Sequence, residues 1–253
     1  RNLISVGAKP LAITNCLNFG NPENQEIMGE FAECLEGVKE ACNFLNYPVV
    51  SGNVSFYNGT NKKNIYPTPV IGGVGLIKKL SKPLSHNFKR ANSTIILIGK
   101  TFGHIEQSCY LKENYSITDG MPPEINLLNE KNNGENLLKL IDKNLILSAH
   151  DISNGGLITA LSEMTLTSDF GAKIYKPKKL TNLFKYFFGE DQARYIIEIQ
   201  TQKLPIVEKI LKESNIYYEN IGFTQENYFE IEGELKISTK DLFKINNQWY
   251  SNY

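Results

Sequence analysis

A long amphipathic helix over residues 23–46 is the feature that most constrains the fold of this chain. Its apolar side chains recur every three or four residues: Ile27, Phe31, Leu35, Val38, Cys42 and Leu45. This period places them on one face of a helix, and such a face has to be buried against another element. Apolar runs over 10–15 and 48–51 flank the helix and are typical of short buried strands. We therefore expect a helix packed on a sheet, with Pro22 at the first helical position.

Strands and helices alternate along the rest of the chain. Further strands are predicted over 69–77, 94–99, 145–148 and 194–199, and helices over 135–143, from 157 and from 204. The tail after about residue 217 is predicted to alternate short strands and turns. Interleaved helices and strands indicate an α/β or α+β protein of layered sheet and helix. The polar, lysine-rich stretch 78–92 predicts a linker between two domains, at 1–85 and 93–253.

Composition excludes several classes of protein. The 253 residues carry 27 basic and 27 acidic side chains, so no broad basic surface for nucleic acid or anionic membrane is expected. No apolar run has the length of a membrane span, and no signal peptide is recognisable. The four cysteines form no CxxC pair, and Cys34 and Cys42 are expected to be buried free thiols of a cytoplasmic protein. The chain begins with Arg1 rather than Met, so we expect its first domain to be truncated at its start.

A polar loop before the long helix is the first candidate site. It reads Thr14-Asn15-Cys16-Leu17-Asn18-Phe19-Gly20-Asn21-Pro22. The N-terminus of a helix offers free N–H groups and partial positive charge, which suit a phosphate, and Asn15 or Asn18 could hydrogen-bond a ligand without adding charge. The alternative is structural, with Asn21 as the helix cap and Asn18 and Gly20 in the turn.

The segment Ser51-Gly52-Asn53-Val54-Ser55-Phe56-Tyr57-Asn58 is the second candidate. Residues two apart in a strand point to the same face, so Asn53 and Ser55 are expected side by side. Gly52 would allow a ligand to approach the backbone closely. A carboxamide oxygen such as that of Asn53 suits Mg²⁺, a hard cation that shares its ligands with substrate phosphates. The alternative is a hairpin with a polar, exposed face.

Two further polar segments lie in the second half of the chain. His150-Asp151-Ile152-Ser153-Asn154-Gly155-Gly156-Leu157 has the order strand, glycine-containing loop and helix, which is typical of phosphate binding. His150 and Asp151 could also form an acid–base pair, whereas the structural alternative makes Asp151 or Ser153 the helix cap. The segment from Gly189 to Arg194 is predicted to be a solvated turn.

These segments, in this order, resemble the synthetase subunit of the phosphoribosylformylglycinamidine synthase family. The resemblance rests on residues 6–14, 17–22, 48–58, 65–69 and 150–157, with a further match at 188–195. It covers nearly the whole chain. The segment 17–22, Leu-Asn-Phe-Gly-Asn-Pro, is among its most specific motifs.

The resemblance implies a fold and an activity. Members of this family are built from a duplicated unit with the aminoimidazole ribonucleotide synthetase-like fold, in which an ATP-binding domain is followed by a companion α/β domain. This chain resembles the second copy, with a partial ATP-binding domain at 1–85 and the companion at 93–253. The implied reaction belongs to purine biosynthesis. ATP phosphorylates the formamide oxygen of formylglycinamide ribonucleotide, and ammonia then displaces phosphate to give the amidine. The implied partners are this substrate, the first half of the synthetase, and a glutaminase subunit or domain that supplies ammonia.

The resemblance also implies roles for four residues. Asn15 and Gly52 align with contacts to ATP, Asn53 with a Mg²⁺ ligand, and Ser55 with a contact to the substrate. Many members have Asp where this chain has Asn15, and an amide brings no charge to a metal. The catalytic His, the ATP-binding Lys and the acidic Mg²⁺ ligands of the family belong to the first copy. We therefore expect no catalytic residue in this chain and no turnover by the chain alone.

Two other hypotheses stay open from the sequence. The chain could belong to another ATP-using enzyme of the same fold group, such as aminoimidazole ribonucleotide synthetase or selenophosphate synthetase. Those enzymes lack the Asn-Phe-Gly-Asn-Pro and Gly-Asn-Val-Ser-Phe-Tyr-Asn signatures found here. Alternatively, the chain is a non-catalytic half that binds a nucleotide only to stabilise its fold.

Overall fold

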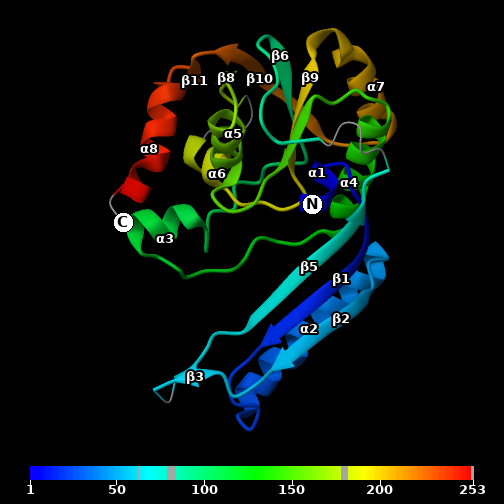
Figure 1. The fold of residues 1–253 in the computed structure, drawn as a ribbon, viewed down its shortest axis with the longest axis vertical. Coiled ribbons are helices and arrows are strands. Elements are labelled where there is room, and N and C mark those ends of the chain that lie inside the picture. Colours follow the sequence, from blue (N-terminus) through cyan, green and yellow to red (C-terminus); the bar gives the residue numbers. More distant parts are fainter. Residues whose placement is uncertain (62, 79–83, 178–181, 252–253) are drawn as a thin grey trace. The chain divides into compact units, whose positions relative to one another are not determined.

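The chain divides into two compact units (Figure 1). The computed structural model describes residues 1–61, 63–78, 84–177 and 182–251. The smaller unit is Ala8–Lys78, and the larger unit combines Arg1–Gly7 with Lys79–Tyr253. The first seven residues therefore pack with the larger unit, although they were expected in the domain at 1–85. The predicted domain boundaries stay a prediction, and residues 79–83 of the predicted linker lie outside the described residues.

The smaller unit is a three-stranded sheet covered by one helix. The sheet has the order β2-β1-β5 and contains β1 (Lys9–Asn18), β2 (Val49–Ser55) and β5 (Thr68–Leu76). β1 runs parallel to β2 and antiparallel to β5. The helix α2 (Gln25–Leu45) connects β1 to β2, and a short ribbon is formed by β3 (Gly59–Thr60) and β4 (Lys63–Asn64). The predicted strand–helix–strand order of this region is therefore confirmed.

Helix α2 begins three residues after Pro22, so the prediction of Pro22 at the first helical position is wrong. Asn24 is the N-cap, because its side chain accepts a hydrogen bond from the backbone N–H of Glu26 at 2.9 Å. Asn21 was the alternative cap, but its side chain accepts from Glu23 and so stabilises the turn before the helix. A carboxamide oxygen can satisfy a free N–H of the first helical turn, which proline cannot do.

The core of the smaller unit lies between α2 and one face of the sheet. Leu17, Phe19 and Ile27 are buried there, and the rings of Phe31 and Phe56 pack against them. The predicted burial of two thiols on α2 is wrong: Cys34 and Cys42 are free but only half-buried. One helix on three strands leaves much of both elements exposed, so the apolar face of α2 is only partly covered.

The larger unit is built on a seven-stranded sheet with the order β12-β11-β8-β10-β6-β9-β7. Its strands are β6 (Ser93–Ile98), β7 (Ser148–Asp151), β8 (Phe170–Ile174), β9 (Tyr195–Gln200), β10 (Tyr218–Glu226), β11 (Tyr228–Ile231) and β12 (Leu235–Ser238). β8 and β11 are parallel, whereas the other neighbouring strands are antiparallel. The helices are α1 (Asn2–Ser5), α3 (Cys109–Tyr115), α4 (Leu127–Asp142), α5 (Gly156–Leu166), α6 (Leu183–Phe188), α7 (Leu204–Glu213) and α8 (Thr239–Ser251).

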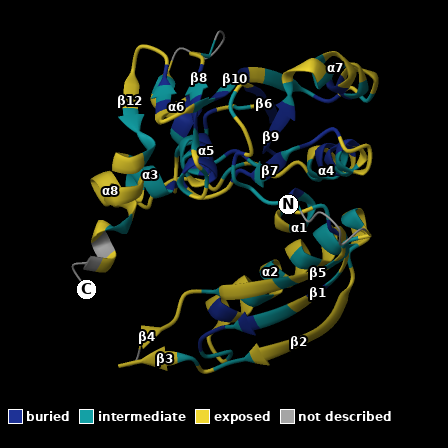
Figure 2. Ribbon diagram, turned by 45° about the horizontal axis from the view of Figure 1, so that its top comes forward, coloured by how far each residue is buried: buried dark blue, intermediate teal, exposed yellow. Residues whose placement is uncertain are grey.

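Two apolar cores lie on opposite faces of this sheet, and its strand β9 is coloured as buried (Figure 2). Ile95 and Leu97 of β6 pack into a core with α5 and α6, while Ile96 and Ile98 pack into a core with α4 and α7. Successive strand residues point to opposite faces, so a strand covered on both faces reads as a continuous apolar run. The predicted fold class of layered sheet and helix is confirmed.

Several element boundaries differ from the prediction. The strand expected at 145–148 is β7 at Ser148–Asp151, and the helix expected at 135–143 begins at Leu127. The tail contains the predicted short strands, but it ends in the unpredicted helix α8. Within the described ranges, no helix combines the length and apolar character needed to cross a membrane.

Candidate functional site

The parallel pairing of β1 with β2 brings Asn15 and Gly52 together. The register places Gly52 opposite Asn15. A β-carbon at residue 52 would collide with Oδ1 of Asn15 and lie 2.8 Å from its carbonyl oxygen. The side chain of Asn15 therefore lies across Gly52. The two residues predicted to contact ATP are thus neighbours, and the space beside Gly52 is filled by Asn15.

Asn53 and Ser55 project from the opposite face of the sheet. Their partners in β1 are Cys16 and Asn18. Strand β2 continues through Ser55, so alternation places Asn53 and Ser55 on one face, as predicted. Asn53 is exposed and Ser55 is half-buried at the carboxyl end of β2. The four predicted site residues therefore form two pairs on two faces, rather than one group.

Asn58 connects the carboxyl ends of β1 and β2. Its side-chain nitrogen donates to the carbonyl oxygens of Phe19 and Ser55, both at 3.0 Å. Its Oδ1 accepts from the hydroxyl of Ser55 at 3.1 Å. The loop before Asn58 includes Tyr57 in the left-handed region, with φ of 59°. The sequence alone assigns Asn58 no separate role, because its partners lie far apart in the chain: Phe19 directly follows β1, and Ser55 ends β2.

The polar segment at the end of β1 and just after it is occupied with internal contacts. The side-chain nitrogen of Asn18 lies 3.4 Å from the carbonyl oxygens of Cys16 and Thr68. Oδ1 of Asn64 accepts from the backbone N–H of Asn21 at 3.1 Å. These contacts favour the structural role for Asn18 and Asn21, although the cap of α2 is Asn24.

The start of α5 is stabilised by a carboxylate of the chain itself. Gly155 is the N-cap, with φ of 77° and no side-chain cap, so the structural alternative, in which Asp151 or Ser153 caps the helix, is wrong. The N–H of Gly155 donates to Oε1 of Glu190 at 2.7 Å, and the N–H of Cys109 donates to the same oxygen at 2.7 Å. The N–H group that a phosphate would use here is therefore already paired with an anion.

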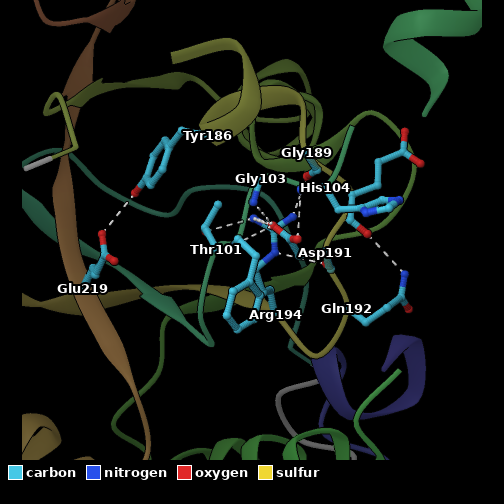
Figure 3. Close-up of polar contacts among 11 residues, drawn as sticks. Thr101, Gly103, His104, Tyr186, Gly189, Asp191, Gln192, Arg194 and Glu219 are labelled. Atoms are coloured by element: carbon cyan, nitrogen blue, oxygen red, sulfur yellow. Dashed lines mark hydrogen bonds and ion pairs between the residues drawn. The ribbon is translucent and has the colours of Figure 1, made fainter. Parts of the chain in front are cut away.

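The segment predicted to be a solvated turn is instead a buried polar network (Figure 3). Asp191 is 5% exposed and accepts from the backbone N–H groups of Phe102, Gly103 and His104 at 2.9, 2.9 and 3.1 Å. Arg194 is fully buried and donates to the carbonyl oxygens of Asp191 and Gly189 and to the hydroxyl of Thr101. Burial lowers the pKa of Arg194 to about 10, so it remains charged at neutral pH. The network fixes the loop that follows β6 to the loop that precedes β9.

His150 belongs to a cluster with two carboxylates and a second histidine. Its Nε2 lies 2.8 Å from Oε2 of Glu163, and its Nδ1 lies 3.6 Å from Oδ1 of Asp151. Burial lowers the pKa of His150, but the contacts with Asp151 and Glu163 outweigh it and raise the pKa to about 9. The ring of His86 lies 5.2 Å away between centroids. A protonated His150 paired with carboxylates is a poor general base at neutral pH, so the proposed acid–base pair is not favoured.

A polar cavity of about 480 Å³ lies in the larger unit. The carboxamides of Asn129, Asn132 and Gln192 line it together with Lys100 and Tyr217. None of the four predicted site residues lines this cavity. In the part of the chain that the structure describes, no three His, Cys, Asp or Glu side chains are grouped closely enough to hold a metal.

Known proteins resemble this chain over its full length. Two family models match it: the N-terminal domain of AIR synthase related proteins over residues 1–77, and the C-terminal domain over residues 90–231. Phosphoribosylformylglycinamidine synthase subunit PurL of Pelagibacter ubique (strain HTCC1062) is 53% identical over 253 residues, which is 100% of this chain and 35% of that relative. PurL of Rhodopseudomonas palustris (strain BisB5) is 42% identical, over 100% of this chain and 34% of the relative. The chain therefore spans about a third of the length of these curated relatives.

Solved structures share the fold. T. maritima PurL complexed with FGAR superimposes with a TM-score of 0.74 at 17% identity, covering 96% of this chain and 41% of that chain. A HypE–HypF complex gives a TM-score of 0.67 at 14% identity, covering 92% of this chain and 78% of that chain. The expected resemblance and the aminoimidazole ribonucleotide synthetase-like fold are both confirmed. The chain belongs to the family of AIR synthase related proteins.

Proposed function

We propose that this chain is the second copy of the duplicated unit in a phosphoribosylformylglycinamidine synthase. The complete enzyme is an ATP-dependent C–N ligase of purine biosynthesis, acting in the cytoplasm. It converts formylglycinamide ribonucleotide to the amidine through a phosphorylated amide and ammonia. The similarity to PurL proteins over the whole of this chain carries this proposal. It favours this enzyme over an aminoimidazole ribonucleotide or selenophosphate synthetase, and over a non-catalytic half.

Within this enzyme, the pair on the open face of β2 is the contribution of this chain to the site. Ser55 contacts the substrate, and Asn53 ligates Mg²⁺ through its carboxamide oxygen. Both project from one face at the carboxyl end of β2, where ligands of parallel strands commonly bind. A T. maritima PurL structure complexed with FGAR supports a substrate of this kind.

The residues fit a magnesium ion that receives most of its ligands from elsewhere. Asn53 is exposed and offers one oxygen, and Mg²⁺ typically takes few protein ligands and completes its shell with phosphates and water. The acidic ligands are expected from the first half of the synthetase. ATP, when bound, supplies the phosphoryl group that activates the amide oxygen. On the sheet face opposite Asn53, Asn15 offers its carboxamide to the nucleotide. Gly52 has no side chain and so leaves room for that carboxamide.

The proposed partners are the first half of the synthetase and a glutaminase that supplies ammonia. Val70 and Val74 of β5 are 53% and 51% exposed on the same sheet face as Asn53. Apolar side chains beside polar site residues suit a surface that is covered by another part of the enzyme. The chain alone is therefore expected not to turn over formylglycinamide ribonucleotide, ATP and ammonia, and robust turnover by residues 1–253 alone would contradict the half-site.

Steady-state kinetics of the complete enzyme test the two roles. Asn53→Ala should weaken the use of Mg-ATP more than it weakens ribonucleotide binding, and Ser55→Ala should do the reverse. Loss of one hydrogen bond by Ser55 should cost about 0.5–1.5 kcal/mol. Asn43→Ala, at an exposed position of α2, is the control and should be silent. If neither site variant changes KM or kcat by more than about twofold, the site assignment is wrong.

A further inference from the structure

The orientation of the Asn58 side chain decides what Ser55 can do. Its nitrogen faces two carbonyl oxygens, of Phe19 and Ser55, each at 3.0 Å. A carbonyl oxygen can only accept, so the nitrogen end of this carboxamide must lie there and not the oxygen end. Oδ1 of Asn58 then points to the hydroxyl of Ser55 at 3.1 Å. Because Oδ1 cannot donate, the Ser55 hydroxyl donates its single proton to Asn58.

A serine hydroxyl has one proton and two acceptor lone pairs. With the proton engaged by Asn58, Ser55 offers only lone pairs to a ligand. A phosphate group at neutral pH is chiefly an acceptor, because its second pKa is about 6. A ribonucleotide amide also carries N–H groups and ribose hydroxyls, which are donors. The donors of the substrate therefore match Ser55, and its phosphate does not.

We propose that Asn58 is a positioning residue that fixes Ser55 as a hydrogen-bond acceptor for an N–H or O–H group of the substrate. This inference rests on the proposed function, because it assumes that Ser55 contacts the substrate. It adds the part of the substrate that Ser55 recognises and the residue that enforces this choice.

The backbone of Asn58 is held as firmly as its side chain. Its N–H donates to the carbonyl oxygen of Phe19 at 3.2 Å, and its carbonyl accepts from Ile65 at 3.2 Å. Phe19 is fully buried in the core between β1 and α2. The preceding residue, Tyr57, donates its N–H to Gly20 at 2.8 Å. Because the backbone of Asn58 is held in place, its carboxamide could turn over only by breaking its three side-chain hydrogen bonds, to Phe19, to the Ser55 carbonyl and to the Ser55 hydroxyl.

A double-mutant cycle in the complete synthetase tests the coupling. Ser55→Ala and Asn58→Ala should each raise KM for the ribonucleotide about three- to tenfold, with kcat within about twofold. The double variant Ser55→Ala/Asn58→Ala should be no worse than the poorer single variant, because both act through one hydrogen bond to the substrate. Independent effects that multiply in the double variant would overturn the positioning role.

The same compound without its phosphate tests which group Ser55 contacts. Ser55→Ala should lower kcat/KM by the same factor for the ribonucleotide and for the dephosphorylated riboside. If the loss disappears with the riboside, the phosphate is the partner and the inference is wrong.

Asn58→Asp covers the case in which Asn58→Ala does not fold. A carboxylate still accepts the Ser55 proton but cannot donate to the two carbonyl oxygens. This variant should therefore melt at a lower temperature yet keep KM within about twofold of the wild type, and a raised KM would count against the inference.

The outcomes separate the inference from the proposed function. If Ser55→Ala is silent, the substrate contact itself fails. If Ser55→Ala weakens binding while Asn58→Ala does not, only the positioning role fails.

Discussion

The side chain of Asn15 occupies the position that a β-carbon at residue 52 would need. The two residues are partners in the parallel register of β1 and β2, and a β-carbon on Gly52 would collide with Oδ1 of Asn15. The glycine is thus explained by a neighbouring side chain of the same sheet. This relationship couples the stability of the strand pair to the placement of a predicted nucleotide contact.

Gly52→Ala should therefore destabilise the chain by about 1–3 kcal/mol and raise KM for ATP in the complete enzyme. Adding Asn15→Ala should recover only part of the lost stability, because the backbone carbonyl oxygen of residue 15 still lies 2.8 Å from the new β-carbon. It should not recover the ATP affinity, because it removes the carboxamide proposed to contact the nucleotide. Chemical unfolding and steady-state kinetics measure the two effects.

Gly29→Ala is the matched control, since a β-carbon there meets nothing within 4 Å. Gly29 lies inside α2, so alanine should stabilise the helix by up to about 1 kcal/mol. A Gly52→Ala variant as stable as Gly29→Ala would contradict the collision.

Asp191 should be among the most sensitive positions of the larger unit. Asp191→Ala leaves three backbone N–H groups without their acceptor and removes the carboxylate nearest the buried Arg194, at a cost of about 3–5 kcal/mol. Asp191→Asn keeps one acceptor oxygen and should lose less. Asp169→Ala, at an exposed position, should change the free energy of unfolding by less than about 0.5 kcal/mol.

Trypsin should cut the predicted linker before Leu84 and not after it. The backbone of the following segment is docked on the larger unit: Phe88 is 1% exposed, and the N–H of Lys89 donates to Oε2 of Glu198 at 2.8 Å. The first fragments should therefore arise from cleavage after Lys78 or Lys79, because Pro83 blocks cleavage after Lys82. Glu198→Ala removes the acceptor and should open Lys89 and Arg90 to cleavage. Early cutting elsewhere, with residues 78–92 intact, would count against the predicted domain boundary.

Stability should fall as pH rises from 6.5 to 9. The pKa of His150 is raised from 6.5 to about 9 in the folded chain, so its stabilising contribution is complete below pH 6.5 and is lost as pH rises through 9. Burial and the neighbouring His150 lower the pKa of His86, which therefore titrates below this window. Glu163 is 50% exposed, and solvent screening limits the expected loss to about 1–2 kcal/mol.

Melting temperatures at pH 6.5 and 9 measure this loss. His150→Gln should flatten the decline, whereas His104→Gln removes a histidine outside the cluster and should leave it unchanged. An equally steep decline in His150→Gln would show that another group is responsible.

The periodic part of the fold could be read from the sequence, because periodicity reports burial directly. α2 and α7 have apolar side chains at helical spacing, and β6 is a continuous apolar run covered on both faces. The helix α8 was not predicted, although Leu242, Ile245 and Trp249 stand at helical spacing, because the neighbouring asparagines Asn246 and Asn247 interrupt its apolar pattern. Its Leu242 packs at the margin of a core formed by distant strands, which no local pattern reveals.

The candidate site was predictable only within one strand. Alternation alone places Asn53 and Ser55 on one face, because both lie in β2. The neighbourhood of Asn15 and Gly52 depends on the register of two strands separated by a helix, and no spacing rule supplies it. The burial of Asp191 was missed for a similar reason: its first N–H donor is Phe102, 89 positions away. A carboxylate in a glycine-containing segment looks solvated until the loop that surrounds it is known.

The contacts of the first seven residues have a consequence for synthesis on the ribosome. Arg1 pairs with Glu130 of α4, 129 positions later, and α1 also packs against β7. The chain thus runs from α1 through the smaller unit and back into the larger one. As the polypeptide emerges, Ala8–Lys78 can collapse while α1 still lacks every partner in α4 and β7. Closing such a long loop is slow, so the larger unit should mature last, after the smaller unit has already formed.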